Sequence, residues 1–394
     1  MAGIGRNKFE LADVVKKFGK AFIENDNLSP RQVKALYNIL QCRTFALGGH
    51  QEECDHCKEV RYSYNSCGDR HCPKCQNTKQ AIWVEDLMKS TLPVNHYHII
   101  FTVPHCLNDL CLWNSGVYYK ILFHAIWRTL HSFGYTHHGA ETGAIAVLHS
   151  WGENLWLHPH VHCIVPAAGY NLKGNWIPIG KSKKYLYPVH QLSDTFKGKF
   201  LDSLKRMLKK EGMTDAFSIQ INKAEKKRWV VHSEPSLAKA EHVIGYLGQY
   251  THKVAITNQR ILQVSDTHVT FISKDYRDNG KNKPKTLEGV EFLRRFCMHV
   301  FPKGFIRIRR YGIYNHTVIR NLELKFVPDE KKDIETIGKS KKKETTAERV
   351  KRLTGFDIGL CPKCKTGRMH SIRELPRIRS PAGHLPSILL SILS

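Results

Sequence analysis

Strand and helix patterns alternate through the middle of the chain. Segments 96–103, 144–150 and 158–165 are short and apolar, and β-branched residues are frequent in them, as is typical of strands. A short turn, WGENLWL, joins the last two, so we predict an antiparallel hairpin. Apolar residues three and four apart predict helices over 107–133, with a break near Asn114, and over 192–211. A mixed order of strands and helices, with neighbouring strands joined as hairpins, favours an α+β fold.

The flanking segments predict further elements. Ser29, Pro30 and Gln32 combine an N-cap, a proline in the first turn and a capping box, so a helix should begin there. Later segments predict two strand pairs, 217–221 with 229–232 and 260–264 with 268–273. A helix is predicted over 235–250 and another over 287–298. A polar break is predicted at 275–285 and a basic strand at 305–310. We expect three regions, at 1–82, 83–280 and 281–394.

Composition narrows the class of protein. The 394 residues include 61 Lys and Arg against 35 Asp and Glu, a formal net charge of +26, which indicates a polyanionic partner such as nucleic acid. A hydrophobic content of 41% excludes a wholly disordered chain. No apolar run approaches the roughly 20 residues that cross a bilayer, and the first residues do not resemble a signal peptide. We therefore expect a cytoplasmic protein without membrane contact, in which clustered cysteines indicate metal.

Cysteine spacing predicts structural zinc. Cys54 with Cys57 and Cys72 with Cys75 form two CxxC pairs, which together could supply four thiolates to one tetrahedral zinc. Six further residues are candidates for additional zinc: Cys42, His50, Cys67, His71, Cys361 and Cys364. The first four could form a second interleaved site or be ordinary residues. The last two offer half a site, which ligands borrowed from the N-terminal cluster could complete.

A histidine-rich strand predicts a different kind of metal site. Alternate side chains of a strand share a face, so His158, His160 and His162 should project together, while Val161 and Cys163 face a core. Imidazoles two residues apart can bind one divalent cation and leave coordination positions open. The third ligand should come from a neighbouring element: His149 is the first choice, with Glu153 and Gln249 as alternatives. The simpler interpretation is a polar surface strand.

Two tyrosines could complete such a site. On a helix, Tyr246 and Tyr250 lie one turn apart on the face opposite Leu237 and Ile244. A phenol can act as a covalent nucleophile, but its pKa near 10 means that it needs a metal or another group to assist. Most such pairs are packing or surface residues, and the histidine strand is what favours a catalytic interpretation here.

These motifs resemble a known family. The strand HPHVHC resembles the His-hydrophobe-His motif of HUH single-strand endonucleases, and YLGQYTHKVAITNQRI is similar to the tyrosine helix of rolling-circle insertion-sequence transposases of the insertion sequence ninety-one type. The segment from Leu47 to Gln76 and the terminal CPKCKTGRM resemble parts of the same family. The resemblance covers about 42–369. It implies an HUH endonuclease-like antiparallel sheet with packed helices, an N-terminal zinc-binding domain and a basic C-terminal region.

The resemblance also implies a mechanism. His160 and His162 would hold Mg²⁺ or Mn²⁺ against the scissile phosphate. Tyr246 would attack it, leaving a 5′-phosphotyrosine and a free 3′-OH, and Tyr250 would be the second nucleophile. The substrates would be single-stranded DNA and hairpins at transposon ends, together with target DNA. A replication initiator, a relaxase and a non-catalytic zinc DNA-binding regulator remain alternatives, although the zinc domain argues against the first two.

Basic side chains are the candidates for DNA contacts. We assign this role to Lys253, Arg260, Arg294, Arg295, Arg307, Arg309 and Arg310. Tyr311 and Tyr314 could stack on unpaired bases. The alternative for the segment around Arg307 is a solvated basic face.

Overall fold

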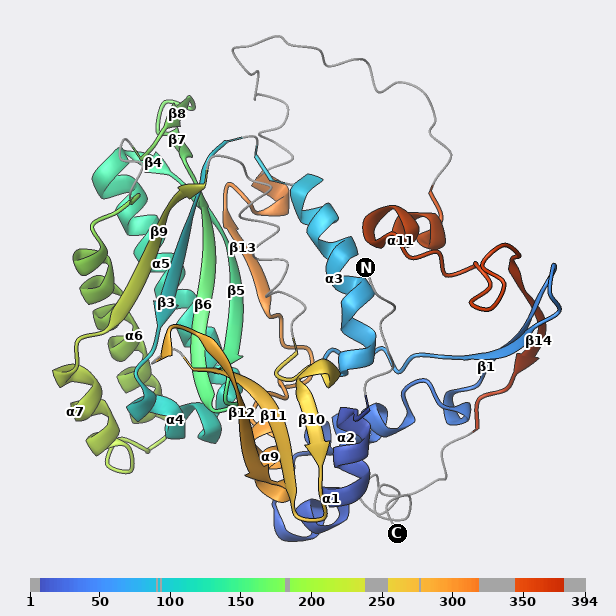
Figure 1. The fold of residues 1–394 in the computed structure, drawn as a ribbon. Helices are drawn as coiled ribbons and strands as arrows, with labels where there is room; N and C mark the ends of the chain where they lie inside the picture. The colour runs from blue at the N-terminus through green and yellow to red at the C-terminus, as the bar shows by residue number, and fades with distance from the viewer. Residues whose placement is uncertain are drawn as a thin grey trace.

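The computed structural model describes residues 8–89, 91–92, 94–180, 185–237, 254–275, 278–318 and 344–378 (Figure 1). Tyr246, Gln249, Tyr250 and Lys253 lie outside the described residues, so their predicted roles stay predictions. Among the residues described, no helix is both long enough and apolar enough to span a membrane.

A five-stranded antiparallel sheet forms the centre of the molecule. Its order is β13 (Ile308–Gly312), β5 (Gly143–Trp151), β6 (Leu157–Pro166), β3 (His96–Thr102) and β9 (Val230–Leu237). Strands β5 and β6 form the hairpin that the sequence predicts. The edge strand β13 comes from the segment assigned to the C-terminal region, so the sheet is assembled from parts of the chain on both sides of position 280.

One face of this sheet packs against two long helices, α5 (Ser115–His138) and α6 (Val189–Lys210) (Figure 1). Val161 and Cys163 are fully buried in this core, as the alternation of β6 predicts. The predicted break before α5 is confirmed: α4 (Asn108–Trp113) ends there, and the Asn114 side chain accepts a hydrogen bond from the Val117 N–H.

The opposite face of the sheet is divided between apolar and histidine side chains. Ile145 of β5 and Ile164 of β6 pack with Leu87 of α3 (Pro73–Lys89) and with Tyr314. Further along the same two strands, the same alternation presents histidines, which are described below. Helix α3 therefore covers one end of this face.

A second core joins the start of the chain to residues near position 270. Helices α1 (Leu11–Asn25) and α2 (Pro30–Gln41) pack with α9 (Gly289–Cys297) and with strands β10 (Ile261–Val264) and β11 (His268–Asp275). The α2 capping box predicted from Ser29 and Gln32 is present. This core crosses the expected boundary at position 82.

A small sheet joins the two ends of the described chain. Strand β1 (Gly49–Cys54) pairs with β2 (Val60–Tyr64) on one side and with β14 (Met369–Leu375) on the other (Figure 1). Helix α11 (Thr346–Thr354) lies against α3, where Arg349 forms an ion pair with Glu85 at 2.5 Å. The remaining short elements are η1 (Phe45–Leu47), η2 (His105–Leu107), β4 (Ala140–Glu141), β7 (Ala168–Asn171), β8 (Trp176–Pro178) and η3 (Asn258–Arg260).

Three predictions differ from the structure. Segment 217–221 belongs to helix α7 (Ser218–Lys226), because Ile221 and Ala224, three residues apart, bury one helical face. Strand β9 continues to Leu237, beyond the helix start predicted at Pro235. The polar break predicted over 275–285 overlaps β12 (Lys281–Glu288), an exposed edge strand held by its pairing with β11, and the helix predicted from 287 begins only at Gly289.

Candidate metal centres

Three histidines meet on the face of the central sheet opposite α5 and α6. His149 of β5 lies directly opposite His160 of β6, and His162 lies two residues further along the same strand. One ring nitrogen of each lies within 4.8 Å of the others, and we call this group the histidine cluster. His149, the first choice for a third ligand, is thus brought to the pair. The alternative Glu153 lies 3.5 Å from Arg260 instead, and His158 is outside the group.

Hydrogen bonds set which nitrogen of each β6 histidine can bind a metal. The Nδ1 of His160 lies 2.7 Å from the backbone carbonyl oxygen of His158, so it must carry the proton and donate it. The Nδ1 of His162 lies 2.9 Å from Nε2 of His98, whose own Nδ1 lies 2.7 Å from a carboxylate oxygen of Glu234. The Glu234 carboxylate accepts, so Nδ1 of His98 carries a proton and donates it. Nε2 of His98 then accepts from the protonated Nδ1 of His162. The Nε2 atoms of His160 and His162 therefore carry lone pairs.

The sequence analysis missed His98 and Glu234. His98 lies in a strongly predicted strand, HYHIIFT, but its role depends on β3 lying beside β6. Glu234 lies in β9, on the other side of β3, opposite His98. The alternation of side chains within each strand predicts which face of the sheet His98 and Glu234 occupy. Only the order of the strands in the sheet shows that they lie beside the histidine cluster.

Burial favours the neutral form of the two β6 histidines. Mainly through burial, and in part through neighbouring positive charge such as that of Arg307, the pKa of His160 is lowered to about 4 and that of His162 to about 2. Uncharged imidazoles are the form that binds metal, so these ligands need not release a proton near neutral pH.

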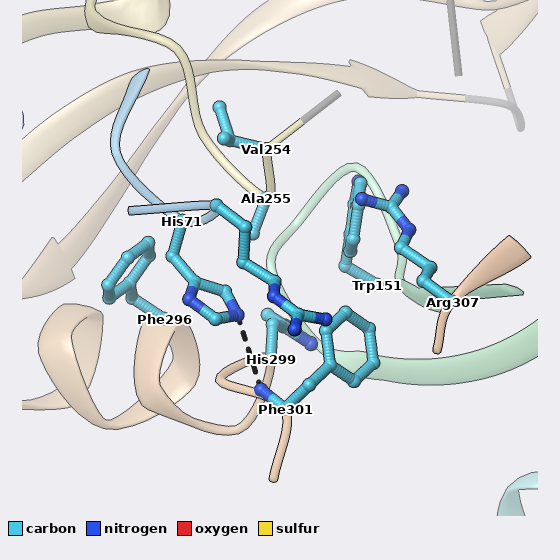
Figure 2. A pocket seen from close by; sticks show the side chains of 9 residues that line it. His71, Trp151, Val254, Ala255, Phe296, His299, Phe301 and Arg307 are labelled. Carbon is cyan, nitrogen blue, oxygen red and sulfur yellow. Dashed lines mark hydrogen bonds between the residues drawn. The ribbon is translucent and has the colours of Figure 1, made fainter. Parts of the chain in front are cut away.

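Arg307 lies at the edge of the histidine cluster. Its Nε donates to the Leu148 carbonyl oxygen at 2.8 Å, and its guanidinium lies over the Trp151 ring at 4.9 Å (Figure 2). Trp151 in turn stacks on His149, with ring centroids 5.2 Å apart. Burial lowers the pKa of Arg307 to about 9, and repulsion from Arg70 adds to the effect, so the side chain stays charged at neutral pH.

A small cavity lies beside Trp151 and Arg307, and His71 lines it (Figure 2). Its volume of about 10 Å³ is at the lower limit for holding a single water, far below what a nucleotide needs. The Nδ1 of His71 lies 2.9 Å from Asp69, and its Nε2 accepts from the Phe301 N–H at 3.2 Å. Both ring nitrogens make hydrogen bonds, and among the described residues His71 is not in any group of possible metal ligands, so the structure does not bring it to the predicted second zinc site.

The cysteines form two quartets, and these differ from the predicted grouping. The first, which we call the N-terminal quartet, contains Cys42, Cys67, Cys72 and Cys75. The second, which we call the composite quartet, contains Cys54, Cys57, Cys361 and Cys364. The two CxxC pairs predicted to share one zinc therefore belong to different quartets. The β1–β2 hairpin explains the separation, because it carries Cys54 and Cys57 to β14. His50, exposed on β1, is in neither quartet.

Sulfur spacing in both quartets suits tetrahedral zinc. The Cys75 sulfur lies 3.5 Å from that of Cys42 and 3.6 Å from that of Cys67. In the composite quartet, Cys54 to Cys364 is 3.7 Å and Cys57 to Cys361 is 3.6 Å. Zn–S bonds of about 2.3 Å in a tetrahedron place sulfurs about 3.8 Å apart. Four protein ligands would leave no open position, as in structural sites.

Several of the predicted DNA-binding arginines are held by contacts within the protein. Arg260 donates to the carbonyl oxygens of Ile272 and Ala255, at 2.8 and 3.3 Å. Arg294 forms ion pairs with Asp26 and Glu291, at 3.0 and 2.6 Å.

The remaining predicted contacts lie on or near β13 and α9. Arg295 forms an ion pair with Glu291 at 2.7 Å, and the guanidinium of Arg309 lies 4.2 Å from the Phe123 ring centroid. Arg310 is partly buried, which lowers its pKa. Tyr311 stacks on Trp127 and Tyr314 is fully buried, so neither is placed to stack on bases.

Comparison with known proteins identifies the family. Residues 143–321 match the family model described as a putative transposase, and residues 14–103 match the transposase zinc-binding domain of the IS91 type. The chain is 36% identical over 398 residues to a putative transposase, y4qJ, of Sinorhizobium fredii, covering 96% of this chain and 98% of that protein. The chain belongs to the IS91-type transposase family. This transposase is also 26% identical over 307 residues to the transposase for insertion sequence element IS801 of Pseudomonas savastanoi pv. phaseolicola, covering 75% of this chain and 73% of that one. No solved structure matches it.

The two matched regions contain different candidate metal centres. The histidine cluster lies within the part that matches the putative transposase model, and the N-terminal quartet lies within the zinc-binding domain. In the composite quartet, Cys361 and Cys364 lie outside both matched regions.

Proposed function

We propose that this transposase nicks and rejoins single-stranded DNA at the ends of its element through a 5′-phosphotyrosine intermediate. The observation that carries the proposal is the histidine cluster, whose β6 ligands are neutral and oriented by hydrogen bonds, with a charged Arg307 beside it. It lies in the part of the chain that matches the transposase model.

The histidine cluster would hold a divalent ion. Three imidazoles leave coordination positions open for phosphate oxygens, unlike the four-thiol quartets. Nitrogen ligands suit Mn²⁺ better than Mg²⁺, which prefers oxygen, so Mn²⁺ should support the reaction at lower concentration. When bound, the ion would withdraw charge from the scissile phosphate.

The tyrosines would carry the covalent step. The phenolic oxygen of Tyr246 would give up its proton to solvent and form a bond to phosphorus, while the bond from phosphorus to the 3′ oxygen breaks. That oxygen would take up a proton from solvent and leave as a 3′-OH, so no net proton is gained or lost. Attack by a 3′-OH on the phosphotyrosine reverses the step and rejoins DNA, so no external energy source is needed. Tyr250 would serve as the second nucleophile when a strand passes from donor to target. Both roles rest on the resemblance of this segment to the family's tyrosine helix.

The charged groups near the cluster suggest how the phosphate is held. Arg307 keeps its charge, and its guanidinium is oriented by the Leu148 carbonyl and the Trp151 ring. A guanidinium held in this way can donate two parallel hydrogen bonds to a phosphate. Among the predicted DNA-binding residues, we therefore propose that Arg307 contacts the scissile phosphate.

A covalent-adduct assay tests the proposal. The protein is incubated with Mn²⁺ and a single-stranded oligonucleotide bearing the element end, and SDS-resistant adducts are mapped by peptide mass spectrometry. We expect the nucleotide on Tyr246, and Tyr246→Phe should abolish the adduct while DNA binding persists. Tyr185→Phe, at an exposed tyrosine, is the matched control and should react as the wild type does.

Other outcomes would redirect or overturn the assignment. An adduct on Tyr250 alone would move the first nucleophile there. The absence of any adduct, with DNA binding intact, would favour a non-catalytic DNA-binding role. An enzyme that supports replication from its origin without moving a marked element between plasmids would be an initiator instead.

A further inference from the structure

The composite quartet joins two parts of the chain that are far apart in sequence. Cys54 ends β1 and Cys57 lies in the following turn, whereas Cys361 and Cys364 lie in a turn that precedes β14. The strands β1 and β14 pair directly, with Cys54 opposite Met369. The match to the zinc-binding domain ends at residue 103 and so includes only half of this quartet.

The two turns have the same local geometry. The Lys58 N–H donates to the Cys54 carbonyl oxygen at 3.2 Å, and the Lys365 N–H donates to that of Cys361 at 3.0 Å. Both lysines have left-handed backbones, with φ of 58° and 57°. Such positions are strained for residues other than glycine, so finding the same one after each CxxC pair indicates two copies of one metal-binding turn.

Backbone groups also approach the sulfurs. The Cys57 N–H points to the Cys54 sulfur at 3.5 Å, and the Gly367 N–H points to the Cys364 sulfur at 3.3 Å. Amide donors of this kind stabilise thiolates, the form that binds zinc. A Cβ at Gly367 would lie 2.5 Å from the Cys54 sulfur, so only glycine lets the C-terminal turn approach this closely.

We propose that the composite quartet binds a second zinc ion, which fastens the C-terminal segment to the N-terminal zinc-binding domain. Polar contacts around it support the same docking: the Arg368 N–H donates to Asp55 at 2.7 Å, and Lys363 lies 2.5 Å from Glu59. These contacts are exposed and contribute little by themselves. The zinc is therefore the main fastening that adds to the pairing of β14 with β1.

Zinc content of the full-length protein tests this site. Zinc is counted in a His160→Ala background, so that the three imidazoles of the histidine cluster add no zinc of their own. This chain should contain two zinc ions, and adding Cys361→Ser with Cys364→Ser should leave one. Cys106→Ser, at a partly exposed cysteine outside both quartets, is the control and should retain two. One zinc before the two cysteines are changed, or two afterwards, overturns the proposal.

Two further measurements keep the test decisive. Co²⁺ replacement is compared between the wild type and the double variant Cys361→Ser with Cys364→Ser. The charge-transfer band of tetrahedral thiolate coordination should be about twice as intense in the wild type, and equal bands count against the site. Alkylation of the denatured wild type without reductant should label all 12 cysteines. Four protected cysteines would mean disulfides between these turns and would overturn the zinc assignment.

An independent observation concerns the hydrogen-bonded chain behind His162. His98 is 1% exposed, and its ring lies nearly parallel to that of His162, with centroids 5.1 Å apart and an angle of 11°. It connects the Glu234 carboxylate to His162 through bonds of 2.7 and 2.9 Å. This arrangement fixes the ring orientation and the tautomer of His162 from behind.

We infer that Glu234 and His98 are positioning residues for metal binding by His162. The inference rests on the proposed function of the histidine cluster. Partners that orient a metal-bound histidine contribute about 10- to 100-fold to metal affinity when tested by mutation. Neither residue would contact the DNA or the ion.

Mn²⁺ affinity without DNA provides the test, measured by titration calorimetry or by the free-Mn²⁺ resonance signal. Glu234→Ala should weaken Mn²⁺ binding about 10- to 100-fold, and Glu234→Gln, whose side-chain oxygen still accepts from His98, should recover part of the loss. Glu225→Ala, at a carboxylate on α7 that pairs with Lys205, is the control and should bind normally.

The outcomes separate the two ideas. A wild type that binds no Mn²⁺ would overturn the proposed role of the cluster itself. A wild type that binds, with Glu234→Ala binding equally well, would overturn the positioning role alone. Equal loss in Glu234→Gln and Glu234→Ala together with a lowered melting temperature would show a purely structural role and would also overturn it.

Discussion

The histidine cluster and the thiol quartets are built in opposite ways. The histidines lie on two adjacent strands of a buried sheet, where strand register and hydrogen bonds between protein atoms hold them. The thiols lie mainly on turns and at helix ends. Those of the N-terminal quartet adjoin the second core, and those of the composite quartet come from both ends of the described chain.

This difference predicts what each metal does. A site formed by a sheet keeps its shape without the ion, and its three ligands leave room for substrate oxygens. A site formed by four thiols on turns is closed to substrate, and the ion itself supplies much of the energy that holds the turns together. Removing metal should therefore abolish activity at one centre and stability at the other.

The largest expected effect separates activity from stability at the histidine cluster. His160→Ala should lower the rate of adduct formation about a thousand-fold, because it removes a ligand of the ion that offsets charge on the phosphate. The melting temperature, measured by calorimetry, should change little because the sheet remains paired. A variant that loses activity only because it unfolds would contradict the view that the sheet preforms this site.

The opposite result is expected at the N-terminal quartet. Cys72→Ser should lower the free energy of unfolding by about 4 kcal/mol or more, since loss of a structural metal is among the most damaging changes. Zinc content and thermal unfolding provide the measurement, with Cys106→Ser as control. An unchanged zinc content and an unchanged melting temperature would contradict the proposed difference between the two kinds of centre.

Arg307 tests which basic residues serve the reaction. Arg307→Met keeps the aliphatic stem but removes the charge, and should lower adduct formation about 100-fold, as loss of a donor to a developing negative charge does. Arg309→Met changes the arginine two positions along, which stacks on Phe123, and should leave the adduct rate near that of the wild type. Similar rates for the two variants would argue against a specific phosphate contact.

Arg260 is expected to give the smallest effect. Its hydrogen bonds to the carbonyls of Ile272 and Ala255 predict a structural role, so Arg260→Lys should cost about 1–3 kcal/mol of stability. Binding of single-stranded DNA, measured by fluorescence anisotropy, should be unchanged. Weaker binding at full stability would restore Arg260 as a DNA contact, as the sequence analysis predicted.

Much of the central domain could be predicted, because its signals are local. The hairpin of β5 and β6 follows from two apolar runs and a short turn, and the Asn114 cap marks the break between α4 and α5. Segment 217–221 shows where this fails: its apolar residues fit a strand or a short helix, and packing against the main core selects the helix. Edge strand β12 has a single aliphatic residue, Leu287, so it carries no alternating apolar pattern.

The same division applies to the candidate sites. By itself, the sequence determined that His160 and His162 share a face and that each CxxC pair acts as a unit, because alternation along a strand and the geometry of a short turn depend only on neighbouring residues. Only the tertiary structure decided which CxxC pairs meet, and that His98 and Glu234 stand behind His162. Those contacts join residues 64 to 310 positions apart. They depend on the order of the strands and on the pairing of distant segments, for which the sequence carries no local signal.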